Sequence, residues 1–175
     1  VLGCAGCTKH QDSIPFSDIM RSKLAWLEHK ETESSNTAVI FLIDKYQHDF
    51  DKATKKRPLM GFLTDCCKSA NIADHAHIFF MPLVYCHTRY RETLTNKTIN
   101  QCSTYFSQFF ANIAGQYEKV FIFCLGSVAC KRMTGKTLAD YIYMQGTVRE
   151  FPITPEYSKP IPVFASYNPL MFLRK

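Results

Sequence analysis

The stretch that decides the fold is Ala38-Val39-Ile40-Phe41-Leu42-Ile43, a run of six residues with no polar side chain. It is short, rich in β-branched residues and apolar on both faces, which is typical of a central strand in a parallel sheet. Comparable runs follow at residues 77–85, 119–125 and 162–167. Helical patterns separate them. This alternation predicts an α/β domain, a three-layer α-β-α sandwich around a central, mostly parallel four-stranded sheet.

The expected helices cover residues 17–30, 58–70 and 98–116, and a fourth begins at Ser127. Residues 44–57 are charged, contain no glycine and predict a loop. Ser127 is the expected N-cap of the fourth helix, and Gly115 the expected end of the third. Gly135-Lys136-Thr137 ends like a phosphate-binding loop, but Cys130 replaces the glycine that such a loop needs five positions earlier. Gly135 is therefore expected to stop a helix.

The composition is that of one globular domain, covering residues 1–175. The chain is 46% hydrophobic, which is ample for one core, and its net charge of +6 favours a polyanionic partner such as nucleic acid. It has no apolar run long enough for a membrane span and no signal peptide pattern. Because it begins at Val1 and stops after Lys175, we expect it to be cut from a larger polypeptide.

A ligand site is expected beyond the carboxyl ends of the strands, as in other open α/β sheets. In this chain those ends lie near Asp44, Tyr85, Gly126 and Asn168.

The cysteine pattern indicates a metal centre. Cys4 and Cys7 form a CxxC pair, which alone fits zinc, a cluster or a redox dithiol. Cys86 and Cys102 lie 16 positions apart instead of forming the second tight pair of a zinc ribbon, so the four are compatible with an iron–sulfur cluster. His87 is an alternative ligand. The remaining cysteines are expected to be small buried hydrophobes; they are Cys66, Cys67, Cys124 and Cys130.

These residues resemble the iron–sulfur, or family 4, uracil-DNA glycosylases. The order and approximate spacing of Cys4, Cys7, Cys86 and Cys102 match that family, in which the four thiolates hold a [4Fe-4S] cluster. Arg57-Pro58-Leu59-Met60-Gly61 is similar to the family's Arg-Pro-Phe-x-Gly segment. The stretch Ala165-Ser166-Tyr167-Asn168-Pro169-Leu170, followed by Leu173-Arg174, is similar to its closing motif. The resemblance implies the uracil-DNA glycosylase fold over nearly the whole chain.

The departures from the family pattern imply that base excision is lost. Only a carboxylate, Asp44, remains of the first motif. Leu59 replaces the ring that stacks on uracil, Pro82 replaces the Asn that reads the base edge, and Asn168 replaces a His. Excision requires a flipped base to be stacked and hydrogen-bonded. If activity survived, Asp44 would orient the water and Asn168 would donate a hydrogen bond.

DNA contact is the function expected to remain. In the superfamily the closing loop wedges into the duplex, and here it offers Leu170, Met171 and Phe172, with Arg174 and Lys175 for phosphates. Packing of these apolar residues into the core is the alternative. Arg89 and Arg91 lie in a second basic and aromatic segment, which could instead be a solvated loop.

The expected function is a catalytically inactive, DNA-binding or scaffolding module of a larger replication or repair protein, for example a viral DNA polymerase. Its expected partners are DNA and other parts of that assembly, with no membrane, in a reducing intracellular compartment. Two rivals stay open: an active glycosylase with altered specificity, and a protein–protein interaction module that does not bind DNA.

Overall fold

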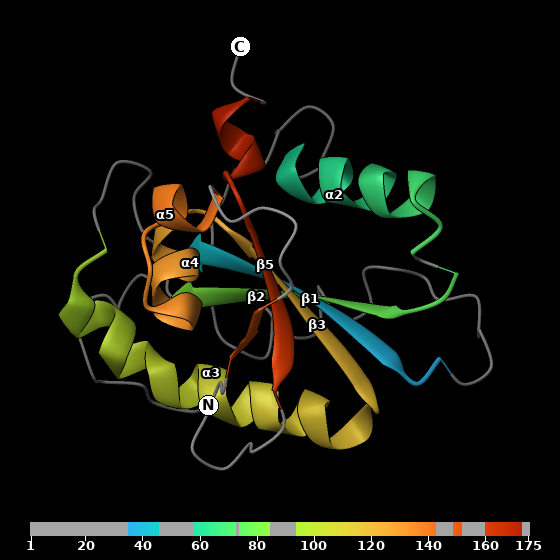
Figure 1. The fold of residues 1–175 in the computed structure, drawn as a ribbon, viewed down its shortest axis with the longest axis horizontal. Helices are drawn as coiled ribbons and strands as arrows, with labels where there is room; N and C mark the ends of the chain where they lie inside the picture. The colour runs from blue at the N-terminus through green and yellow to red at the C-terminus, as the bar shows by residue number, and fades with distance from the viewer. Residues whose placement is uncertain are drawn as a thin grey trace.

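A five-stranded sheet forms the centre of the molecule (Figure 1). The computed structural model describes residues 35–45, 58–72, 74–84, 94–142, 149–151 and 160–172. The strands are β1 (Thr37–Lys45), β2 (His77–Val84), β3 (Lys119–Leu125), β4 (Arg149–Phe151) and β5 (Ile161–Ser166), in the order β2-β1-β3-β5-β4. Four strands are parallel, and only the short β4 runs antiparallel to its neighbour β5. The expected α/β class and mostly parallel sheet are confirmed, while β4 was not foreseen.

The described helices are α2 (Pro58–Ser69), α3 (Asn96–Gln116), α4 (Ser127–Thr134), α5 (Leu138–Ile142) and the 3-10 turn η2 (Pro169–Met171). Three of them lie where the sequence pattern predicted them, whereas the two short ones, α5 and η2, were not foreseen. The helix expected over residues 17–30 lies outside the described residues. Among the described helices, none combines the length and the apolar character needed to cross a bilayer.

The ends of α3 and α4 that the sequence predicted agree with the structure to within two residues, but the role predicted for Gly115 does not. Helix α3 begins after Thr95, whose side chain accepts from the backbone N–H of Thr98, and it continues through Gly115 to Gln116. The predicted end of the helix at residue 116 is confirmed, but the terminating role predicted for Gly115 is wrong, because Gly115 keeps a negative φ within the helix. Gly135 does stop α4: its φ is +70°, and its N–H donates to the carbonyl of Lys131.

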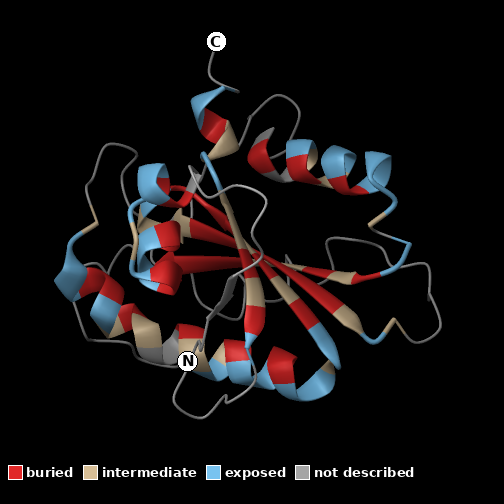
Figure 2. Cartoon of the chain, viewed as in Figure 1, coloured by how far each residue is buried: buried red, intermediate tan, exposed pale blue. Residues whose placement is uncertain are grey.

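The residues of β1 alternate between the two faces of the sheet, and each face is covered by helices. Ala38, Ile40 and Leu42 belong to the cluster that also contains buried residues of α3, α4 and α5. Val39, Phe41 and Ile43 belong to the cluster that contains residues of α2 and η2. Figure 2 shows the strands as the most continuously buried part of the chain. The central strand β1 therefore contributes side chains to the apolar clusters on both faces of the sheet, as its apolar sequence predicted.

Candidate functional site

The carboxyl ends of three strands meet at one edge of the sheet. The N–H of Gly126, directly after β3, donates to the carbonyl of Ser166 at the end of β5, over 2.9 Å. Asp44 of β1 lies against Gly126, since a Cβ atom on that glycine would come within 2.7 Å of the carboxylate. The predicted convergence of Asp44, Gly126 and the segment before Asn168 is therefore present, whereas Tyr85 lies outside the described residues.

Asp44 caps helix α4 from 85 positions away in the sequence. Its Oδ1 accepts a hydrogen bond of 2.7 Å from the backbone N–H of Ala129, in the first turn of α4. The prediction that Ser127 is the N-cap is wrong, because Ser127 already belongs to the helix and Gly126 holds the cap position without a side chain. The φ of +121° at Gly126 favours glycine there, so the capping oxygen comes from a neighbouring strand. The carboxylate that could orient a water thus supports the helix.

Asn168 holds the turn that follows β5. Its Oδ1 accepts from the N–H of Leu170 at 3.0 Å, and its carbonyl accepts from the N–H of Met171 at 3.0 Å. The side chain is half-buried. This bonding leaves the amide nitrogen, Nδ2, as the group with which Asn168 can donate to a ligand.

Leu59 and Pro82, which the resemblance noted in the sequence would align with base-binding positions, both belong to the interior. Leu59 is 7% exposed and packs in one apolar cluster with Ile43, Leu125 and Leu170. Pro82 is buried within β2, in register with Ile43 of β1. Neither position presents a ring or a polar side chain to a base.

The closing turn has one buried residue and two exposed ones. Leu170 is only 5% exposed, which corrects its assignment as a DNA contact, because its side chain fills the core beneath α2. Met171 and Phe172 are 67% and 69% exposed. Figure 1 shows η2 beyond the end of β5 and beside α2. Arg89, Arg91, Arg174 and Lys175 lie outside the described residues.

Of the four proposed cluster ligands, Cys102 is the one that the structure describes. Its side chain is buried in α3, in a small cluster with Val84 and Ile99, against which Leu94 and Val128 pack. Cys4, Cys7 and Cys86 lie outside the described residues. Within the described ranges, no three His, Cys, Asp or Glu side chains gather into a possible metal site. Burial in an apolar cluster is also found for the cysteines expected to be small buried hydrophobes, so the role of Cys102 as a cluster ligand stays a prediction.

The other cysteines are mostly buried and protonated. Burial raises the pKa of the Cys67 thiol to about 11, and it raises the pKa of Cys124 and of Cys130. The negative charge of Asp44 contributes to the shifts of Cys124 and Cys130. These three confirm the expectation of small buried hydrophobes, but Cys66 is exposed on α2. It lies one residue before a buried position, so the helix turns its side chain away from the core.

Comparisons with protein families and curated proteins do not assign a function to this chain. No protein-family model matches this chain, and no curated protein matches it either. The function therefore has to be argued from the geometry of the strand edge and from the cysteine pattern.

Proposed function

We propose that this chain is a diverged uracil-DNA glycosylase-like domain that binds DNA without excising bases, as a module of a larger replication or repair protein. The observation that carries this proposal is the pair of exposed apolar side chains, Met171 and Phe172, at the tip of the closing turn.

The tip has the properties of a wedge. Large apolar side chains that stay exposed are unfavourable in water, and minor-groove proteins insert such side chains between base steps. The turn is held below the tip by buried Leu170, by the Asn168 cap and by the hydrogen bond from Phe172 N–H to the carbonyl of Pro169, at 2.9 Å. A turn that is already ordered loses little entropy on binding. The net charge of +6 adds attraction to the phosphates.

Three features support the loss of catalysis. One oxygen of Asp44 is engaged by the α4 backbone, Leu59 lies in the core, and Pro82 offers no side-chain hydrogen bond. A base extruded toward this edge would meet neither a stacking ring nor a reader of its hydrogen-bonding edge.

The proposal includes a [4Fe-4S] cluster held by Cys4, Cys7, Cys86 and Cys102. Val84 and Cys102 share one buried cluster, and Cys86 follows Val84 by two residues, a distance that extended chain spans in at most about 7 Å. A thiolate at position 86 is thus within reach of a centre bound by Cys102. The cluster would supply structure, because ligation ties the amino-terminal CxxC segment to the sheet.

The wedge is tested by duplex binding at several salt concentrations. We expect weak, sequence-independent binding that falls steeply with added salt, and we expect Phe172→Ala to weaken it several-fold. Phe62→Ala is the matched control, since Phe62 is also exposed, at 41%, but lies on α2. Absence of binding at low salt, or equal losses in both variants, would favour a protein–protein module instead.

The loss of catalysis is tested with a uracil-containing oligonucleotide and alkaline cleavage of abasic sites. We expect no strand breaks above background from single- or double-stranded substrate. Breaks that disappear in Asp44→Asn would show that excision persists and would refute this part of the proposal.

A further inference from the structure

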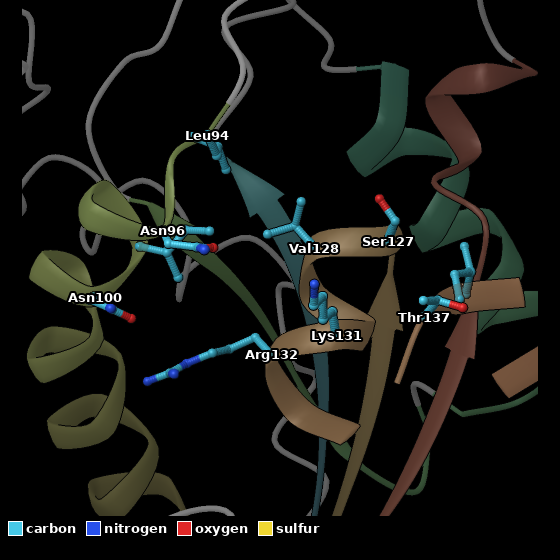
Figure 3. A pocket seen from close by; sticks show the side chains of 10 residues that line it. Leu94, Asn96, Asn100, Ser127, Val128, Lys131, Arg132 and Thr137 are labelled. Atoms are coloured by element: carbon cyan, nitrogen blue, oxygen red, sulfur yellow. The ribbon is translucent and has the colours of Figure 1, made fainter. Parts of the chain in front are cut away.

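A cavity of about 480 Å³ lies between the first half of α3 and helix α4 (Figure 3). None of its lining residues belongs to the closing turn. Its size falls in the range of small-molecule sites, roughly 300–1,000 Å³. The cavity is therefore a second candidate site, separate from the DNA-binding tip.

Part of the cavity lining carries positive charge and hydrogen-bond donors. Its polar lining residues are Asn96, Asn100, Ser127, Lys131, Arg132 and Thr137, and no carboxylate lines it among the described residues. Figure 3 shows the Arg132 side chain extending from α4 toward α3, where Asn100 lies. Lys131 and Arg132 are exposed, and neither forms an ion pair within the part of the chain that the structure describes. Two unpaired cations facing one cavity favour a ligand with an anionic group.

Apolar side chains from the same parts of the chain form the rest of the lining, the apolar wall, which rests on the core. Leu94, Ile99, Val128 and Leu138 line it. Leu94, Ile99 and Val128 also belong to the cluster around Cys102, so this wall is backed by packed side chains and is held in place. A flat apolar group would be desolvated against it, while Asn96 and Asn100 could hydrogen-bond the edge of that group.

We propose that this cavity binds a nucleotide unit, with the phosphate at Lys131 and Arg132 and the base against the apolar wall. The unit could come from a free mononucleotide or from a single strand of nucleic acid, because both present a phosphate next to a base. The proposal does not depend on the wedge: the two sites share no residues.

The first test is titration of the purified protein with deoxyadenosine monophosphate, deoxyadenosine and inorganic phosphate. We expect the nucleotide to bind with a Kd of about 1 mM or tighter, and each of the two fragments to bind at least about tenfold more weakly. The double variant Lys131→Ala, Arg132→Ala should lose nucleotide binding by about tenfold or more. Its control, Lys68→Ala with Lys119→Ala, removes the same charge from exposed positions outside the cavity and should bind normally.

A second variant tests the cavity itself. Asn100→Trp adds a large side chain at an exposed position of α3 and should block the nucleotide without changing the melting temperature by more than a few degrees. Competition by a single-stranded oligonucleotide would identify a strand as the source of the unit, and failure to compete would identify the free nucleotide.

The proposal is overturned if the nucleotide does not bind, if nucleoside and nucleotide bind equally, or if the charge-matched control loses as much as the cavity variant. Phe172→Ala should leave mononucleotide binding unchanged. The experiments therefore distinguish a failure of the DNA-binding proposal at the closing turn from a failure of the nucleotide-binding proposal at the cavity.

Discussion

Removing the Asp44 carboxylate should destabilise the protein by an amount that the structure allows us to estimate. Asp44 accepts a charge-assisted hydrogen bond of 2.7 Å from Ala129 N–H at the start of α4. Such bonds contribute about 1.5–3 kcal/mol, and helix N-caps about 0.5–2 kcal/mol, so we expect Asp44→Ala to cost about 2 kcal/mol. For a chain of this size that corresponds to a melting temperature about 4–8 °C lower. Asp44→Asn should cost less, because an amide oxygen can still accept from Ala129.

A double-mutant cycle of Asp44 and Gly126 tests whether the stability effects of the two residues are coupled. Gly126→Ala places a side chain on a backbone with φ +121° and 2.7 Å from the Asp44 carboxylate, so it combines backbone strain of about 1–3 kcal/mol with a steric clash. In the Asp44→Ala background the clash is absent, and we expect a coupling of about 1 kcal/mol or more.

Thermal unfolding is monitored by circular dichroism for the parent protein, the two single variants and the double variant, which gives the four stabilities that the cycle needs. If Asp44→Ala melts at the same temperature as the parent protein, the capping role is refuted and Asp44 becomes available for catalysis again. If the two substitutions are additive, the close approach of Asp44 to Gly126 is refuted.

Three further predictions concern other parts of the chain. Gly115→Ala should raise stability by about 0.5 kcal/mol in the same unfolding assay, because Gly115 has helical backbone and open space around a Cβ atom; a lower melting temperature would contradict its place inside α3. Mass spectrometry after brief alkylation at pH 8 should find Cys66 modified and Cys67 intact, since a pKa of about 11 keeps the buried thiol protonated until the pH approaches that value; equal labelling would count against the orientation of α2. The parent protein is expected to be brown and to contain four iron atoms per chain, and Cys102→Ala and Cys86→Ala should each abolish the colour and the iron content. Stoichiometric zinc in the parent protein would exclude the cluster.

The strands could be predicted from the sequence because their pattern is local. The run around Ile40 is apolar on both faces, and only a central strand of a covered parallel sheet makes use of such a run. Helix α3 was predicted to within two residues at its start and correctly at its end, Gln116, although Gly115 does not terminate it.

The interactions that organise the site could not be predicted, because they join distant parts of the chain. Nothing near Ser127 indicates that its helix is capped by Asp44, 85 positions before Ala129. Strand β4 has three residues, too few for a periodic pattern. The cavity beside α3 and α4 is lined by polar surface residues from separate helices, which in the sequence look like ordinary solvated positions.

Pro82 has a consequence beyond the absence of a base-reading amide. In the described sheet β2 is an edge strand, and outward-facing N–H groups on such a strand offer a template for pairing with another chain. Because proline has no N–H, a sheet accommodates it on an edge strand, and Pro82 lies on such a strand. Pro82 therefore offers no N–H through which a further strand could pair with β2 at this position. Pro82→Asn would give the strand an additional N–H and with it a further donor for pairing with another chain.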